Sequence, residues 1–244
     1  MNLNGAKVTD AGLKEIANLT QLKTLILYDT QVTDIGVKEL AKLKRLQMLN
    51  LGFTKVSLEG VKALAALTDL QSLSLDYTTA GDASVKELVA LKHLQVLDLT
   101  GTKVTNVGLK ELADFQHLQT LALGWTGVTN AGLKELAALK NLQTLNLQRT
   151  RVSGVGLKAL AGLQYLRTLD LDGTPVADAG AAELATLQHL ESLDLGLTRV
   201  TNEGAKELAK LKKLRWLRLR DNEVTRLGAE DLQQALPGCK IIRK

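Results

Sequence analysis

Cysteine, proline and aromatic residues are all scarce in this chain of 244 residues. The one cysteine, Cys239, cannot form an internal disulfide, and no cysteine-rich segments flank the rest of the sequence. This excludes a small secreted domain held together by disulfides and favours a reducing setting. With 3% aromatic residues, the core has to be built from Leu, Val and Ala, so an aromatic residue outside the core pattern carries information.

Long apolar runs are also absent from the sequence. Residues 1–7 lack the basic start, apolar stretch and cleavage site of a signal peptide. No segment approaches the roughly 18 uninterrupted apolar residues of a membrane-spanning helix. We therefore expect no membrane association and a cytoplasmic localisation.

Basic residues only slightly outnumber acidic residues. The sequence has 31 Lys and Arg against 26 Asp and Glu, a formal net charge of +5. The basic residues are spread along the whole chain, which favours a solvated charged surface over a nucleic-acid-binding patch.

The sequence does contain an internal repeat, in which glycine recurs every 24 residues or, where Ser84 takes its place, after 48. Ten units follow one another without an insertion or deletion. The glycines are Gly12, Gly36, Gly60, Gly108, Gly132, Gly156, Gly180, Gly204 and Gly228. Such a strict period predicts a solenoid of stacked units.

Each unit also carries the pattern Leu-x-x-Leu-x-Leu-x-x-Thr-x-Val, which begins at Leu22 in the first complete copy. Leu25 and Leu27 alternate along a short strand, so both point to one buried face. The segment 33–43 then carries apolar residues at the spacing of a two-turn helix, with a Thr or Asp able to cap it. We expect about nine parallel strands, each followed by one short helix.

One strand and one short helix cannot close a core alone, so each unit must bury its leucines against its neighbours. The recurring Thr that begins at Thr30 is predicted to form a ladder of hydroxyl bonds to loop backbone. The recurring glycine is predicted to allow close approach of the helix to the chain beneath it. Ala80, Ser84 and Val89 depart from their columns, so we expect the fourth unit to be the least regular.

These residues resemble the leucine-rich-repeat family, with Thr where that family usually has Asn or Cys. The continuation Val-Thr-Asp-x-Gly-Leu-Lys-Glu-Leu-Ala is similar to the cysteine-containing and bacterial GALA-like subclasses. The resemblance covers the whole chain and implies an α/β fold, a right-handed horseshoe with a concave parallel sheet and convex short helices. Residues 1–244 are interpreted as one such domain of about ten units, partial at the N-terminus.

Aromatic residues are concentrated on the predicted concave face. The residues that lie between and just after the strand leucines vary from unit to unit, whereas the scaffold is monotonous. Five of the seven aromatic residues lie there, namely Tyr28, Phe53, Tyr77, Trp125 and Trp216. Exposed aromatic rings are common anchors of protein interfaces. The alternative is that the rings lie flat over the strand ends and cover backbone.

Charged residues on this face are sorted along the chain. The acidic ones are Asp76, Asp98, Asp170, Asp172 and Asp194, and the basic ones are Arg215, Arg218 and Arg220, close to Lys210, Lys212 and Lys213. A partner with complementary charge would be steered to such a face. Alternatively, Asp194 and Arg218 neutralise each other across adjacent strands. The candidate partner-binding residues are the five aromatics, these five aspartates and Arg218.

The sequence gives little support to catalysis, a metal site or a cofactor. His93, His117 and His189 share one column just before a strand, which is predicted to be a solvent-facing loop position. Two neighbouring histidines fall short of a structural zinc site. Phosphate-binding loops, nucleophile elbows and paired-cysteine zinc spacings do not occur. Cys239 is interpreted as a small buried residue in an end cap.

The leading functional hypothesis is therefore a non-enzymatic module that binds an unidentified protein through its concave face. The alternative is a structural or engineered scaffold without a natural ligand, suggested by the absence of insertions and deletions. Nucleic acid is not an expected partner, because basic and aromatic residues lie at opposite ends. At the N-terminus, Leu3 and Val8 occupy core columns with nothing before them. This predicts either a fragment that lacks its N-terminal cap or end-to-end self-association of two copies.

Overall fold

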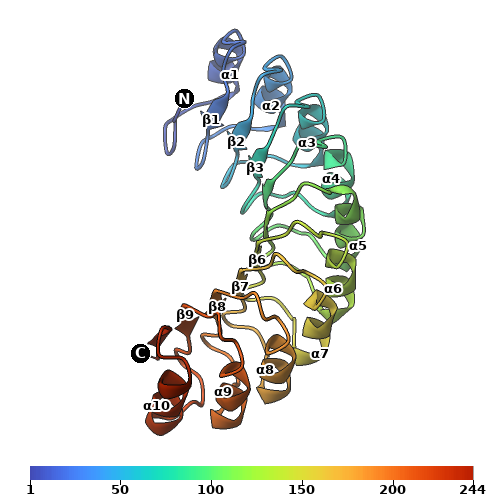
Figure 1. The fold of residues 1–244 in the computed structure, drawn as a ribbon. Coiled ribbons are helices and arrows are strands. Elements are labelled where there is room, and N and C mark those ends of the chain that lie inside the picture. The colour runs from blue at the N-terminus through green and yellow to red at the C-terminus, as the bar shows by residue number, and fades with distance from the viewer. Residues whose placement is uncertain (244) are drawn as a thin grey trace. The chain divides into compact units, whose positions relative to one another are not determined.

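The computed structural model describes residues 1–243, which form two compact units, 1–122 and 123–243. Both units are stacks of the same repeat. In each unit the strands lie side by side on one side of the chain, and the helices lie on the other (Figure 1). The prediction of a single domain over residues 1–244 stays a prediction.

The first unit contains five strands that pair in chain order, all parallel. Its elements are α1 (Asp10–Ile16), β1 (Thr24–Ile26), α2 (Asp34–Leu40), β2 (Met48–Asn50), α3 (Leu58–Leu64), β3 (Ser72–Ser74), α4 (Asp82–Leu88), β4 (Val96–Asp98), α5 (Asn106–Leu109), the 3₁₀ helix η1 (Glu111–Asp114) and β5 (Thr120–Ala122). Leu25 lies opposite Leu49 in the sheet, so each residue of β1 pairs with the residue at the same repeat position in β2.

The second unit also contains five parallel strands paired in chain order. Its elements are α6 (Asn130–Leu136), β6 (Thr144–Asn146), α7 (Gly154–Leu157), the 3₁₀ helix η2 (Lys158–Leu160), β7 (Thr168–Asp170), α8 (Asp178–Leu184), β8 (Ser192–Asp194), α9 (Asn202–Leu208), β9 (Trp216–Arg218), α10 (Arg226–Ala235) and β10 (Lys240–Ile242). Residues 1–243 thus form ten strands rather than the nine predicted, because residues 240–242 pair with β9.

The core of each unit consists of the repeat leucines, as predicted. Leu25 and Leu27 are fully buried, and their equivalents in the later repeats are buried as well. The predicted threonine ladder is also confirmed. In eight repeats the hydroxyl donates to the carbonyl of the strand leucine three residues earlier, at 2.5–2.7 Å. Each buried hydroxyl and each of these carbonyls is therefore satisfied within its own repeat.

A column of Asp and Asn at the first position of most helices links each repeat to the next. Asp34 accepts hydrogen bonds from the backbone N–H and the hydroxyl of Ser57, at 2.7 and 2.6 Å. Asp82 accepts from the N–H and hydroxyl of Thr105 and from the N–H of Gly108. Sequence reasoning treated this Asp as a cap of its own helix, whereas it caps the following one. We call these residues the inter-repeat column: Asp10, Asp34, Asp82, Asn130, Asp178 and Asn202.

The recurring glycine allows the inter-repeat column to approach, which confirms the predicted close packing. A Cβ on Gly36 would lie 2.5 Å from Asp10 Oδ1, and one on Gly204 would lie 2.5 Å from Asp178 Oδ1. Any larger residue would displace the carboxylate from the hydrogen bonds that it accepts.

The prediction that the fourth unit is the least regular is wrong. Helix α4 has seven residues like α2 and α3, and the Ser84 hydroxyl accepts a hydrogen bond from the N–H of Gly81. The irregular helices are α5 and α7, which end after four residues and continue as η1 and η2.

Each irregular helix lies beside a residue that changes the volume at its column. Phe115 follows η1 and is buried where other repeats have the smaller Leu. Gly154 replaces Asp at the start of α7, and a Cβ there would lie 2.6 Å from the Gly180 backbone. The absent side chain lets α7 approach α8 more closely than Asp would allow.

Candidate functional site

The candidate site lies on the face of each sheet turned away from the helices, which we call the outer sheet surface, and on the turns that follow the strands. In the first unit Tyr28, Phe53 and Tyr77 form a continuous aromatic row there. Their ring centroids are 5.2 Å apart between Tyr28 and Phe53 and 4.4 Å apart between Phe53 and Tyr77. Such tilted ring pairs contribute roughly 0.5–1.5 kcal/mol beyond the area that they bury.

The aromatic rings are exposed, as predicted. Phe53 is 44% exposed, Tyr77 43% and Trp125 52%, while Tyr28 is half-buried. The alternative, in which the rings cover backbone, applies to Tyr77. A Cβ on Gly101 would lie 2.5 Å from a ring carbon of Tyr77, so that ring rests against the next turn. Trp216 is half-buried on β9.

The turn after each of β1 to β9 holds one residue in the left-handed region. The residues are Asp29, Phe53, Tyr77, Gly101, Trp125, Arg149, Gly173, Leu197 and Asp221, with φ between 52° and 67°. Glycine adopts this conformation freely, but other residues lose roughly 1–2 kcal/mol in it. The exposed aromatic side chains therefore stand where glycine would serve the fold better.

We predict an inverted order of stability at Phe53 because of this conformation. The Phe53→Gly variant should be more stable than Phe53→Ala by about 1 kcal/mol, whereas glycine usually destabilises relative to alanine. Chemical denaturation of both variants measures this difference. Ile26, a strand residue on the same sheet, is a control at which Ile26→Gly should be the less stable of the pair. Equal stability of the two Phe53 variants would contradict the account of the turn.

In the second unit Trp125 forms a cation–π contact with an arginine of the same chain. The Arg149 guanidinium lies over the Trp125 ring, 5.5 Å from its centroid. The Arg149 side chain also rests against Gly173, where a Cβ would lie 2.5 Å from Arg149 Cδ. The Trp125 ring is thus occupied by a residue of the same chain on one side and exposed elsewhere.

The carboxylates of the candidate site fall into two groups. In the second unit Asp194 lies 3.0 Å from Arg218, and Asp172 lies 3.8 Å from Arg149. Mutual neutralisation of Asp194 and Arg218, the alternative interpretation of the sequence, is therefore present. In the first unit Asp76 and Asp98 have no ion pair to any of residues 1–243.

Part of the acidic pattern has a structural role that sequence reasoning missed. Asp98 accepts a hydrogen bond from the N–H of Thr100, two residues later, at 2.9 Å. The equivalent bonds form at Asn50, Asn146, Asp170 and Asp194, at 2.8–2.9 Å. These side chains hold the turn that presents the next column. The signal in the sequence is that Asn and Asp both recur at this one position of the repeat.

Burial perturbs two of the aspartates. Burial raises the pKa of Asp76 above its ordinary value, the Ser74 hydroxyl that donates to it lowers the pKa, and the Asp98 carboxylate raises it. Burial likewise raises the pKa of Asp170, which the N–H of Asp172 partly offsets. The charged forms of both groups are thus disfavoured at the outer sheet surface.

We predict that Asp170→Asn stabilises the protein at neutral pH. Because the pKa of Asp170 is raised on folding, the folded state binds the proton more tightly than the unfolded state. The stability that this contributes is fully present below the unfolded pKa and is lost as pH rises through the folded pKa. The amide keeps the turn hydrogen bond, as Asn146 does. The free energy of unfolding should exceed that of the parent at pH 7 and converge with it near pH 3. Asp231→Asn on α10 is the control, and a gain that persists at pH 3 would contradict the prediction.

The remaining chemical groups lie off the aromatic row. His93 and His117 are exposed, with ring centroids 6.5 Å apart, and His189 is exposed as well. Cys239 is buried, which raises the pKa of its thiol. Among residues 1–243 no three His, Cys, Asp or Glu side chains are grouped as for a metal ion, and no helix is long and apolar enough to cross a membrane.

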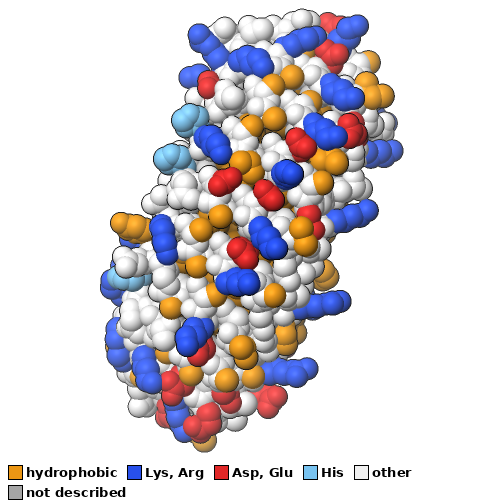
Figure 2. All heavy atoms as spheres, turned by 90° about the vertical axis from the view of Figure 1, so that its right-hand side faces the viewer, with side chains coloured by type: hydrophobic (Ala, Val, Ile, Leu, Met, Phe, Trp, Pro, Cys, Tyr) orange, Lys and Arg blue, Asp and Glu red, His pale blue; other side chains and the backbone are white. Residues whose placement is uncertain are grey.

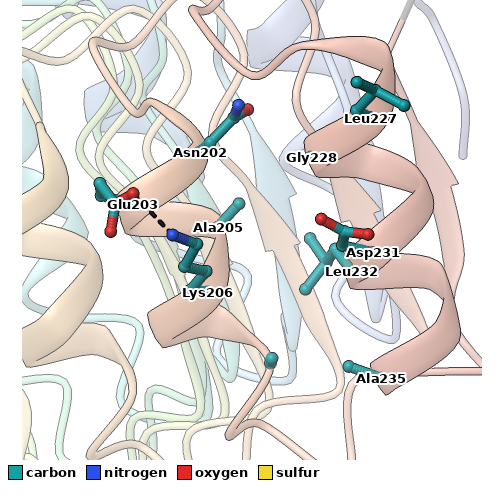
Figure 3. Close-up of a pocket in the computed structure, with 10 residues that line it drawn as sticks. Asn202, Glu203, Ala205, Lys206, Leu227, Gly228, Asp231, Leu232 and Ala235 are labelled. Atoms are coloured by element: carbon teal, nitrogen blue, oxygen red, sulfur yellow. Dashed lines mark hydrogen bonds and ion pairs between the residues drawn. The ribbon is translucent and has the colours of Figure 1, made fainter.

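The helix side differs from the outer sheet surface. Figure 2 shows Lys and Arg side chains interspersed with Asp and Glu over this side. A groove of about 400 Å³ lies between α9 and α10, with Glu203, Lys206 and Asp231 on its walls and Leu232 toward the core (Figure 3). Lys206 and Glu203 pair with each other at 2.6 Å. The groove therefore gathers no charge of one sign and no reactive set of side chains.

Comparisons with known proteins agree with the repeat. A family model described as leucine-rich repeat region matches residues 74–243. Two solved structures from Listeria monocytogenes str. 4b F2365 are similar. One is an internalin (inlF), with 25% identity, a TM-score of 0.76, and coverage of 98% of this chain and 72% of the other. The second is internalin C2 (inlC2), with 26% identity, a TM-score of 0.64, and coverage of 97% and 84%. No curated protein matches the sequence.

Proposed function

This chain belongs to the leucine-rich-repeat family, and we propose that it is a non-enzymatic module that binds another protein through its outer sheet surface. The family fold is typical of protein-binding scaffolds, but the fold alone assigns no partner. The residues proposed to contact the partner are Tyr28, Phe53, Tyr77 and Trp125, with the charged residues around them.

One observation carries this proposal. Phe53, Tyr77 and Trp125 are exposed aromatic residues at left-handed turn positions, where Gly101 and Gly173 serve the same turn without strain. The fold needs this conformation in every such turn, but it does not need a large side chain there, and strained residues of this kind are concentrated at functional sites. Large exposed aromatic rings are also the residues that dominate binding energy in protein interfaces.

The charged residues supply orientation rather than most of the binding energy. Asp194 and Arg218 already satisfy each other, so a partner would have to compete with that pair. Lys210 forms an ion pair with Glu207, and the Lys213 ammonium lies within hydrogen-bond distance of His189. This lowers the support for nucleic-acid binding at that end, which needs free cations along a backbone.

Capture experiments test the proposal. The protein is immobilised, incubated with lysate and compared with a Tyr77→Ala/Trp125→Ala variant by quantitative mass spectrometry. We expect one or more proteins to be lost from the variant by tenfold or more, since truncation of an interface anchor costs about 2 kcal/mol. The control is Ile35→Ala, which removes an exposed apolar side chain from the helix side.

Retention of every captured protein by the Tyr77→Ala/Trp125→Ala variant would contradict the proposal. A parent protein that captures nothing would favour the alternative, a scaffold without a natural ligand. Thermal unfolding of both variants shows whether they remain folded.

We also propose self-association through the N-terminal repeat. Leu3, Val8 and Ile16 are half-buried and Leu19 is 46% exposed, whereas their equivalents one repeat later are fully buried. Covering such side chains with a second copy would contribute roughly 1.5–3 kcal/mol each. Sedimentation over a wide concentration range should show a dimer that Leu3→Ser/Val8→Ser removes. A parent protein that is monomeric at all concentrations would contradict this.

A further inference from the structure

The outer sheet surface of the first unit carries carboxylates that the chain itself leaves unpaired. They are Asp29, Asp76 and Asp98, and none forms an ion pair with any of residues 1–243. The outward-facing positions of β1 to β4 and of the turns after them contain no Lys or Arg. This surface is therefore uniformly acidic, although the whole chain has a net charge of +5.

The second unit shows the opposite arrangement at the same repeat positions. Asp172, Asp194 and Asp221 each lie within 4.0 Å of an arginine of their own unit. The ring of Trp125 likewise has the Arg149 guanidinium over it. An exposed ring and three of the four carboxylates at these positions are thus matched internally by arginine in the second unit, whereas Asp170 forms no ion pair with any of residues 1–243.

The aromatic row of the first unit has no cation of that kind among residues 1–243. Its rings are exposed and lie beside Asp76, whose carboxylate helps raise the pKa of Tyr28, after the larger effect of partial burial. A guanidinium within about 6 Å of a ring centroid is attracted to the ring face and can bond a carboxylate at its edge. A neutral apolar segment would cover the rings but leave Asp76 and Asp98 desolvated without a partner.

We propose that this surface binds an arginine-containing, basic segment of the partner protein. Guanidinium groups contact the exposed ring surface of Phe53 and Tyr77 and hydrogen-bond to Asp76 and Asp98. In the second unit Arg149 likewise lies over Trp125, and Arg218 hydrogen-bonds to Asp194. The inference rests on the proposed function and adds the charge and side-chain type of the partner. Charge complementarity and the exposed surface of the rings select this occupant over a neutral or acidic one.

A defined peptide pair tests the proposal directly. A fluorescently labelled peptide with six arginines is titrated with the protein, and the same peptide with citrulline in place of arginine is the uncharged counterpart. We expect binding of the arginine peptide and at least a tenfold weaker affinity for the citrulline peptide. Raising the salt concentration from 0.05 to 0.3 M should lower the affinity for the arginine peptide severalfold, because exposed charges are screened.

Variants locate the binding site. Tyr77→Ala and Asp76→Asn should each lower the affinity for the arginine peptide by about tenfold, which corresponds to about 1.4 kcal/mol of binding free energy. Leu197→Ala, at the same turn position in the second unit, and Asp231→Asn, on α10, should change the affinity less than twofold. If Tyr77→Ala does not fold, Tyr77→Gly replaces it, since glycine suits the turn.

Several results would overturn the proposal. Equal affinity for the citrulline peptide would show that arginine is not recognised, and insensitivity to Asp76→Asn would place the peptide elsewhere. Sedimentation that shows a dimer lost in Tyr77→Ala would make a second copy the occupant, in place of a separate partner. A lysate protein that needs Tyr77 but tolerates Asp76→Asn and 0.3 M salt would overturn the inference while the proposed function stands.

Discussion

Replacing Asp178 with alanine is expected to lower the free energy of unfolding by about 3 kcal/mol. Its carboxylate accepts three hydrogen bonds from the next repeat, from the N–H and hydroxyl of Thr201 at 2.8 Å and from the N–H of Gly204 at 3.0 Å. Alanine leaves these donors without their partner. Hydrogen bonds to charged groups contribute a net of roughly 1.5–3 kcal/mol each, and water can reach these part-buried donors, so the loss stays below the sum of three. Chemical denaturation measures the loss.

Two matched variants sharpen this prediction. Asp178→Asn should fall between the parent and Asp178→Ala, because Asn130 and Asn202 perform the same role with an amide. Asp231→Ala removes an exposed aspartate from α10 and should change the stability by less than about 0.5 kcal/mol. A loss at Asp178 no larger than the loss at Asp231 would contradict the inter-repeat column.

Gly204→Ala is expected to destabilise the protein by about 1–3 kcal/mol, although alanine is the better helix former. The new Cβ would lie 2.5 Å from Asp178 Oδ1 and 2.9 Å from Val200 Cγ1, so the carboxylate has to move. In an Asp178→Ala background the same substitution should cost clearly less, because only the contacts with Val200 Cγ1 and Ala181 Cβ remain. The two effects are thus non-additive, which a double-mutant cycle measures.

Gly12→Ala is the control within the same column. A Cβ there would meet only Val8 Cγ1, at an ordinary distance of 3.5 Å. This substitution should therefore stabilise the protein by up to about 1 kcal/mol. If Gly12→Ala and Gly204→Ala have equal effects, the close approach of the inter-repeat column does not explain the recurring glycine.

The repeating scaffold could be predicted from the sequence because one physical requirement recurs at fixed spacing. Leu25 and Leu27 alternate as a half-buried strand does, and the threonine that follows has to satisfy its buried hydroxyl nearby. The role of Asp34 could not be predicted in this way. An acidic residue in the first helical turn suggests a local effect, whereas its hydrogen-bond partner Ser57 lies 23 residues later.

The regularity of individual repeats was also misjudged, for a physical reason. Three substitutions suggested a distorted α4, but Ser84 remains small and its hydroxyl accepts a local bond. The distortions arise instead at α5 and α7, beside Phe115 and Gly154. A single change of volume in a close-packed stack has more effect than several changes that preserve it.

For the candidate site, the sequence indicated which residues are exposed but not the backbone that holds them. Phe53, Tyr77 and Trp125 share a column with Gly101 and Gly173, and these two glycines are the signal for a positive φ. The ion pairs that occupy Asp172 and Asp194 could be anticipated only as an alternative, because side-chain geometry decides them.

The most direct test of the account is a paired measurement of stability and binding on the Phe53→Gly/Tyr77→Gly variant. Relief of the left-handed conformation should offset the lost ring packing, so the free energy of unfolding should stay within about 1 kcal/mol of the parent. Capture of the partner should fall by tenfold or more. A variant that loses several kcal/mol of stability, or that keeps full binding, would contradict the claim that these rings serve a partner rather than the fold.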